Sequence, residues 1–205
     1  MTREEFLNNY WRYYLILEQK MMNSLQFVEL DVDNFYAFSM EFITQIQNLG
    51  SEVDTIMKVI AGFQLSSRKT ITDYASTILV KYPSITQQEV KIQNNSLIIK
   101  PFKNWNTNQP SKSLVWWENY NEIKHGRTQN MKKANLNTTL HLLGALYILE
   151  IYLLKEIADT YNDVDIPDSE SKLFIMMNWN YKNMSMAGMI CEVYEGNPVI
   201  GGGTF

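Results

Sequence analysis

A run of fifteen mostly apolar residues, Leu140 to Leu154, constrains the fold of this chain more than any other feature of its sequence. Only His141 and Glu150 interrupt it with strongly polar side chains. The run falls short of the roughly 20 apolar residues that a membrane-spanning helix needs. A helix that is apolar on all sides must be covered on all sides. The run therefore predicts a central helix within a soluble core.

Apolar residues recur at steps of three and four along most of the chain, which is the pattern of amphipathic helices. Two capping-box pairs, Thr2 with Glu5 and Ser51 with Asp54, predict helix starts. Gly50 stands where a left-handed helix stop is expected. The predicted helices cover residues 3–28, 35–49, 51–63, 71–81, 114–125 and 134–161.

The helical pattern gives way to two-residue alternation between residues 88 and 101. Apolar residues alternate on both sides of Asn94-Asn95, which predicts a β-hairpin. Pro110 is expected to open the helix that follows, and Gly126 to end it.

The C-terminal tail, 163–205, is predicted to be irregular with some β structure. Residues 163–171 indicate a surface loop and 174–179 have strand character. A weaker hairpin is expected to join 189–193 to 198–200 through Gly196-Asn197. The whole chain then forms one mainly α domain, 1–205, of about five or six helices with one or two small β-hairpins.

Composition narrows the classes of function. One cysteine excludes an intramolecular disulfide and indicates a reducing compartment. Two histidines with that single cysteine argue against a metal site, so we expect no metal and no cofactor. The net charge of −4 gives no overall basic field for nucleic acid. The charged N-terminus is not a signal peptide, and we expect a cytoplasmic protein without a membrane partner.

One segment, 116–127, carries residues suited to chemistry. On a helix, Trp117, Asn121 and His125 are four residues apart and share one face. Lys124 and Arg127 place two cations beside the imidazole, where they can hold a phosphate. Histidine changes its charge near neutral pH and is therefore suited to proton transfer.

The end of this segment, Asn121-Glu122-Ile123-Lys124-His125-Gly126, resembles the signature of HEPN domains. That family's motif is an arginine, commonly followed by a polar residue, with a histidine a few residues later near a helix end. His125 matches the histidine and Asn121 the polar residue, whereas Tyr120 stands at the position of the arginine. The resemblance implies a helical bundle in which a long helix follows the motif.

Many HEPN proteins are metal-independent endoribonucleases, often toxins or antiviral effectors, and build one site across a homodimer. Others are inert partners or nucleotide-binding modules. The resemblance thus implies His125 and Asn121 as catalytic residues, with Lys124, Arg127, Tyr120 and Trp117 as phosphate or substrate contacts. It also implies a homodimer, RNA or a nucleotide as ligand, and an antitoxin-like protein as a further partner. The alternative is an inactive module that binds through the same face.

Other polar residues leave alternatives open. Glu52 and Asp54 fit the first turn of a helix, where carboxylates are favoured, and either could instead support the site from across the bundle. Glu41 interrupts an apolar stretch, and a buried carboxylate there would need Lys58 or Lys124 as partner. His141, among leucines, is expected to be a hydrogen-bonded core histidine. The two tryptophans, 116 and 117, either pack the helix or stack on a base.

Overall fold

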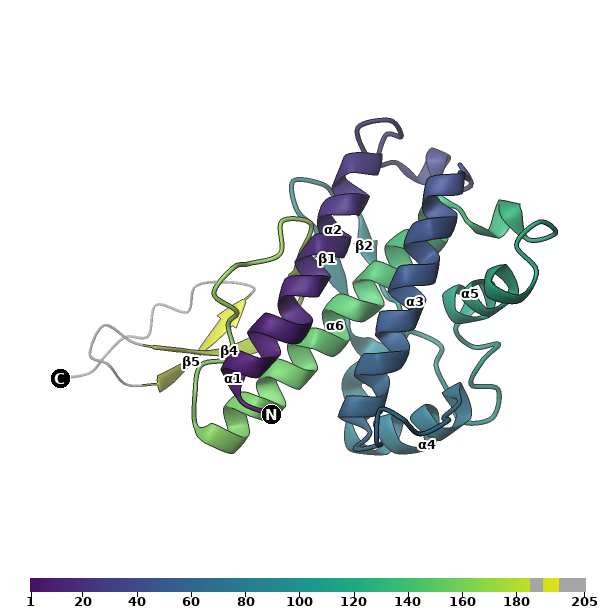
Figure 1. Ribbon diagram of the computed structural model, residues 1–205. Coiled ribbons are helices and arrows are strands. Elements are labelled where there is room, and N and C mark those ends of the chain that lie inside the picture. Colours follow the sequence, from purple (N-terminus) through teal and green to yellow (C-terminus); the bar gives the residue numbers. More distant parts are fainter. Residues whose placement is uncertain (185–189, 196–205) are drawn as a thin grey trace.

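The computed structural model describes residues 1–184 and 190–195. Within them the fold is mainly α, with five helices and two small antiparallel sheets (Figure 1). No helix among these residues is long and apolar enough to cross a membrane.

The first helix is continuous from residue 3 to residue 24. It comprises α1 (Arg3–Phe6), the π-helical stretch η1 (Leu7–Trp11) and α2 (Arg12–Ser24). The predicted capping box is confirmed, because the Thr2 hydroxyl accepts from the Glu5 amide and the Glu5 carboxylate accepts from the Thr2 amide. The helix ends four residues before the predicted limit at residue 28.

The prediction that Gly50 ends a helix is wrong. One helix, α3 (Met40–Ile60), runs through it, and the predicted start at residue 35 is also wrong, since Ser39 caps α3. The Tyr120 ring explains the glycine: a Cβ atom on Gly50 would lie 2.3 Å from Cδ2 of Tyr120. The glycine is therefore a point of close helix contact and keeps its helical conformation. The short 3-10 helix η2 (Val32–Asn34) precedes α3.

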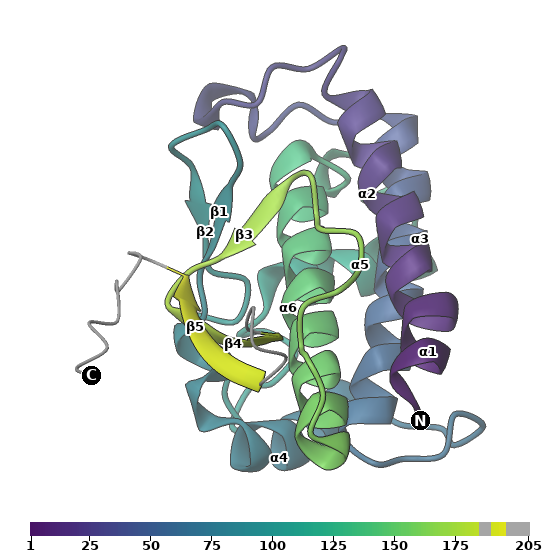
Figure 2. The ribbon, with the colours of Figure 1, turned by 90° about the vertical axis from the view of Figure 1, so that its left-hand side faces the viewer.

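The predicted central helix is confirmed as α6 (Leu136–Tyr161), which Asn135 caps and a left-handed Asn162 follows. Figure 2 shows α1, α2 and α3 on one side of α6 and the strands β1–β3 on the other. Covered from both sides, α6 buries the run that predicted it except His141, which is half-buried. At Gly144 the sheet comes close, and a Cβ atom there would lie 2.7 Å from the Ile99 side chain.

The predicted hairpin is confirmed as β1 (Val90–Ile92) and β2 (Ile98–Ile99). A third strand, β3 (Phe174–Met176), adds to β1, so that the order is β2-β1-β3. The turn contains Asn94 with a positive φ of 56°. Asparagine tolerates this left-handed conformation better than most residues.

The second sheet pairs β4 (Trp179–Met184) with β5 (Ile190–Glu195). The strand character predicted for residues 174–179 is thus confirmed in part, because a turn separates β3 from β4. Strand β5 covers part of the predicted second hairpin, but its partner is β4. The expected partner, 198–200, and the Gly196-Asn197 turn lie outside the described residues.

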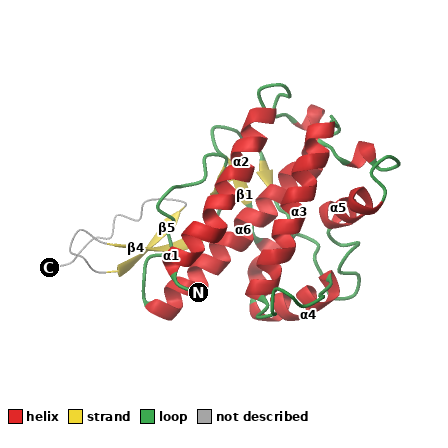
Figure 3. Cartoon of the chain, viewed as in Figure 1, coloured by secondary structure: helices red, strands yellow, loops and turns green. Residues whose placement is uncertain are grey.

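Two further helices lie beside the bundle, α4 (Ile71–Lys81) and α5 (Val115–His125), as predicted (Figure 3). The 3-10 helices η3 (Pro83–Gln87) and η4 (Met131–Lys133) follow them. Pro110 does not open α5, because the helix begins five residues later. Gly126 ends it with a φ of −150°, and so not in the left-handed conformation.

Candidate functional site

Helix α5 is fixed in the protein by aromatic side chains from its first two turns. Trp116, Trp117 and Tyr120 are each at most 5% exposed. The Trp116 indole donates to the Pro101 carbonyl at 2.7 Å, and the Tyr120 ring covers Gly50 of α3. These contacts confirm that the two tryptophans pack the helix. They hold its backbone against α3 and α6, so that its last turn is held in a fixed orientation.

The last turn of α5 is polar and faces solvent. Lys124 and His125 are exposed, and so is Arg127 just beyond the helix. Asn130 closes the helix end, because its amide donates to the carbonyls of Glu122 at 3.1 Å and Gly126 at 2.9 Å. The sequence reasoning missed this role of Asn130, although an asparagine four residues after a helix-ending glycine is a usable signal.

The imidazole of His125 has no hydrogen-bond partner among the described residues. Asn121, which lies one turn earlier, donates its side-chain amide to the Trp117 carbonyl at 2.9 Å. The two side chains share a helix face as predicted, but no hydrogen bond joins them. His125 is therefore available to a ligand, and Asn121 does not orient its ring in the single chain.

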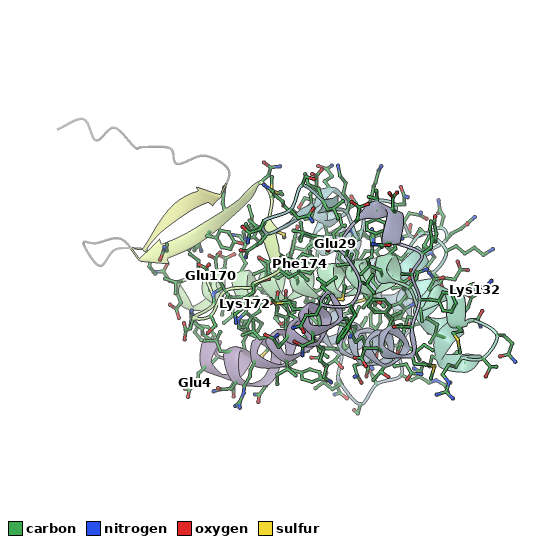
Figure 4. All side chains as sticks on the ribbon, turned by 90° about the horizontal axis from the view of Figure 1, so that it is seen from above. Glu4, Glu29, Lys132, Glu170, Lys172 and Phe174 are labelled. Carbon is green, nitrogen blue, oxygen red and sulfur yellow. The ribbon has the colours of Figure 1, made fainter. Side chains whose placement is uncertain are left out.

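Cations gather around this end of α5. Residues 123–134 contain four lysines and arginines and no carboxylate. Lys124 Nζ lies 3.4 Å from the Tyr120 hydroxyl, and Lys133 forms an ion pair with Glu122. Lys132, which sequence reasoning did not single out, projects from the same end of the molecule (Figure 4). The surface near His125 is therefore locally basic on a chain that is acidic overall. We call Lys124, His125, Arg127 and Lys132 the α5 basic end.

Tyr120 and Trp117, expected as substrate contacts, are placed differently. Both lie in the core, with 4% and 5% of their surface exposed. Their rings contact each other, with centroids 5.4 Å apart. Neither ring is open to solvent in this chain, so of the four expected contacts only Lys124 and Arg127 have exposed side chains.

None of the three acidic residues considered as supports is hydrogen-bonded or ion-paired with His125. Glu41 is exposed and accepts from Gln45 at 2.9 Å, so it is not a buried carboxylate that would need Lys58 or Lys124 as partner. Its position in the first turn of α3 explains this, because Phe42 and Ile43 face the core whereas Met40 and Glu41 face solvent.

Asp54 has partners of its own, and Glu52 is partly buried. Asp54 forms an ion pair with Lys58 at 2.7 Å and accepts from the Tyr74 hydroxyl at 2.7 Å. Burial raises the pKa of Glu52, whose charge acts on Tyr10 and Glu150. The prediction that both residues lie in the first turn of a helix is wrong, because they lie in the middle of α3. Neither carboxylate forms a hydrogen bond or ion pair with His125.

The prediction that His141 is a hydrogen-bonded core histidine is confirmed in part. Its Nδ1 is hydrogen-bonded to the Asn137 carbonyl at 2.9 Å, and burial lowers the pKa of the imidazole. It is not enclosed in the core, however, because it also lines a surface cavity.

In the part of the chain that the structure describes, no group of three or more histidine, cysteine, aspartate or glutamate side chains could hold a metal ion. Comparison with protein-family models, with curated proteins and with solved structures gave no match to this chain.

Proposed function

We propose that this chain is a HEPN-like protein that contacts RNA through the α5 basic end and cleaves it there with His125 as a general acid or base. The observation that carries the proposal is an exposed, unpartnered imidazole between two exposed cations, Lys124 and Arg127. The aromatic packing of α5 supports it, because a site on a fixed helix loses little entropy when it orders a ligand.

The chemistry uses the RNA itself as nucleophile. His125 would remove the proton of a ribose 2′-hydroxyl, or protonate the leaving 5′-oxygen, as that hydroxyl attacks the adjacent phosphate. Lys124 and Arg127 would stabilise the negative charge that develops on the phosphate oxygens. The need for a 2′-hydroxyl would restrict cleavage to RNA.

A second function, binding without cleavage, is favoured by one specific observation. Tyr120, at the position of the family's arginine, is packed on Gly50 and cannot contact a phosphate. Asn121 is bonded to the Trp117 carbonyl. In this alternative the same basic end would bind RNA, a nucleotide or an antitoxin-like protein.

The experiment measures cleavage and binding separately. Purified protein is incubated with mixed single-stranded RNA in EDTA, and binding is followed by fluorescence anisotropy of a labelled oligonucleotide. We expect wild type to cleave and His125→Asn to bind RNA without cleaving it. A general acid or base contributes about 10²–10⁴-fold to rate, so the loss should be of that size. Lys20→Gln, which changes an exposed lysine on α2, is the matched control.

Each outcome separates the two functions. Binding by wild type without cleavage at high enzyme concentration would support the inactive module. Equal cleavage by wild type and His125→Asn would remove His125 from the mechanism. RNA binding that is unchanged in Lys124→Gln and Arg127→Gln would contradict both functions.

We also propose a homodimer in which two α5 basic ends form one site. A second copy would supply the missing orientation of His125 and further positive charge. Light scattering at micromolar concentration tests this, and a strict monomer that cleaves RNA would contradict the shared site.

A further inference from the structure

A cavity of about 510 Å³ lies at the end of α5 opposite to His125. Its walls come from the loop before α3, the β2 strand with the residues after it, the start of α5 and the first turns of α6. Small-molecule sites in proteins commonly have volumes of about 300–1,000 Å³. The cavity is therefore large enough for a ligand of metabolite size.

The cavity wall combines apolar surfaces with cations. Phe35 and the exposed Val115 supply apolar surface, and Lys100 and Lys103 supply positive charge. No aspartate or glutamate is among the lining residues. The chain as a whole is acidic, but this cavity wall carries an excess of positive charge. That excess favours an anionic ligand.

The two lysines differ in their availability. Lys100 is already in an ion pair with Glu89. Lys103 is exposed, and its ammonium group has no hydrogen-bond or ion-pair partner among the described residues. Lys103 is therefore the cation that can meet an anionic group without first breaking another contact.

His141 supplies a polar group with a defined orientation. Its Nδ1 meets the Asn137 carbonyl, which can only accept, so Nδ1 carries the proton. In the neutral ring Nε2 is then an acceptor, and it has no partner among the described residues. Burial keeps the ring neutral at neutral pH by lowering its pKa.

We infer that this cavity binds a small organic anion with a flat apolar body. The body would lie against Phe35 and Val115, the anionic group would meet Lys103, and a donor on the ligand would reach Nε2 of His141. Val115 and His125 are ten residues apart on one helix, about 15 Å by helical rise. The cavity is therefore separate from the α5 basic end and does not depend on the proposed function.

The test uses two dyes of similar shape, the anionic anilinonaphthalene sulfonate and the uncharged phenylnaphthylamine. Fluorescence titration of the full chain should give one site for the anion, with affinity about tenfold higher than for the neutral dye. Lys103→Gln should weaken binding of the anionic dye by about fivefold, and Lys103→Arg should restore that binding. These factors correspond to one exposed charge contact.

The matched control is Lys172→Gln. Lys172 is exposed, precedes β3 at the other edge of the three-stranded sheet and has no place in the cavity wall. Its substitution should leave the affinity for both dyes unchanged.

The two histidines show independently where on the protein the dye binds. Imidazole NMR signals should show only two rings, and His125→Asn assigns them. The anionic dye should shift the signals of His141 and leave those of His125 in place.

The proposal is overturned if both dyes bind equally, if several equal sites appear, if Lys103→Gln behaves like Lys172→Gln, or if only His125 responds. A failure here leaves the RNA experiment unaffected.

Discussion

Two buried carboxyl groups, Glu18 on α2 and Glu150 on α6, have opposite surroundings. Their exposed fractions are 2% and 0%. Glu18 accepts from the Tyr14 hydroxyl at 2.7 Å and from the backbone amides of Lys172 at 2.9 Å and Leu173 at 3.2 Å, and it also accepts from the Ser171 hydroxyl. Neither carboxyl oxygen of Glu150 has a partner among the described residues.

The comparison shows that burial alone does not define the role of a carboxyl group. Glu18 fixes the segment before β3 against α2, and its donors replace the water that a carboxylate loses on burial. Burial and the charge of Glu18 raise the pKa of Tyr14, so that its hydroxyl remains a donor. Burial, and then the nearby charge of Glu52, raise the pKa of Glu150 well above 4.5, which favours the neutral acid.

The largest expected effect comes from removing the satisfied group. Glu18→Ala removes the acceptor shared by two hydroxyls and two backbone amides and should lower the free energy of unfolding by about 3 kcal/mol. Urea denaturation measures it, with Gln19→Ala on the exposed side of the same helix as control. A loss below about 1 kcal/mol would mean that water replaces the carboxylate easily.

A smaller effect of opposite sign is expected at the second carboxyl. Glu150→Met replaces an unpartnered buried acid with an apolar side chain of similar length, and at about pH 5 it should raise the free energy of unfolding by about 1–2 kcal/mol. The same denaturation experiment measures the gain. Destabilisation by Glu150→Met would show that the carboxyl has a partner, such as a buried water.

The smallest effect is a difference in pH dependence. The folded protein holds the Glu150 proton more tightly than the unfolded chain, so this stabilisation is complete below about pH 4.5 and is lost as the pH rises through the raised pKa. As the pH rises above about 5, wild type should therefore lose stability relative to Glu150→Gln. Glu52 and Tyr10, which interact with Glu150, stay in both proteins. Parallel pH profiles would rule out Glu150 as the titrating group.

Much of the secondary structure could be predicted because its signals are local. The Thr2–Glu5 capping box, the alternation around Asn94 and the apolar run of α6 each depend on neighbours in sequence. Gly50 could not be interpreted in this way. A glycine that ends a helix and a glycine that admits Tyr120 look alike in the sequence, and only a contact seventy residues away distinguishes them.

The candidate site was predictable in part for the same reason. The clustering of Lys124, His125 and Arg127 follows from their spacing at a helix end. That Asn121 bonds to its own helix, and that Tyr120 is buried, depends on how α5 packs. The cavity beside His141 was not predictable, because four segments distant in sequence form it.

The sequence by itself determined a mainly α chain, its central helix, its first hairpin and a cluster of cations around one histidine. These features follow from periodicity, capping and composition, which act over a few residues. The tertiary structure alone decided which buried acid has donors, why position 50 is glycine and where an anion-binding cavity forms. These features depend on atoms that the sequence places far apart and that packing brings within a few ångströms of each other.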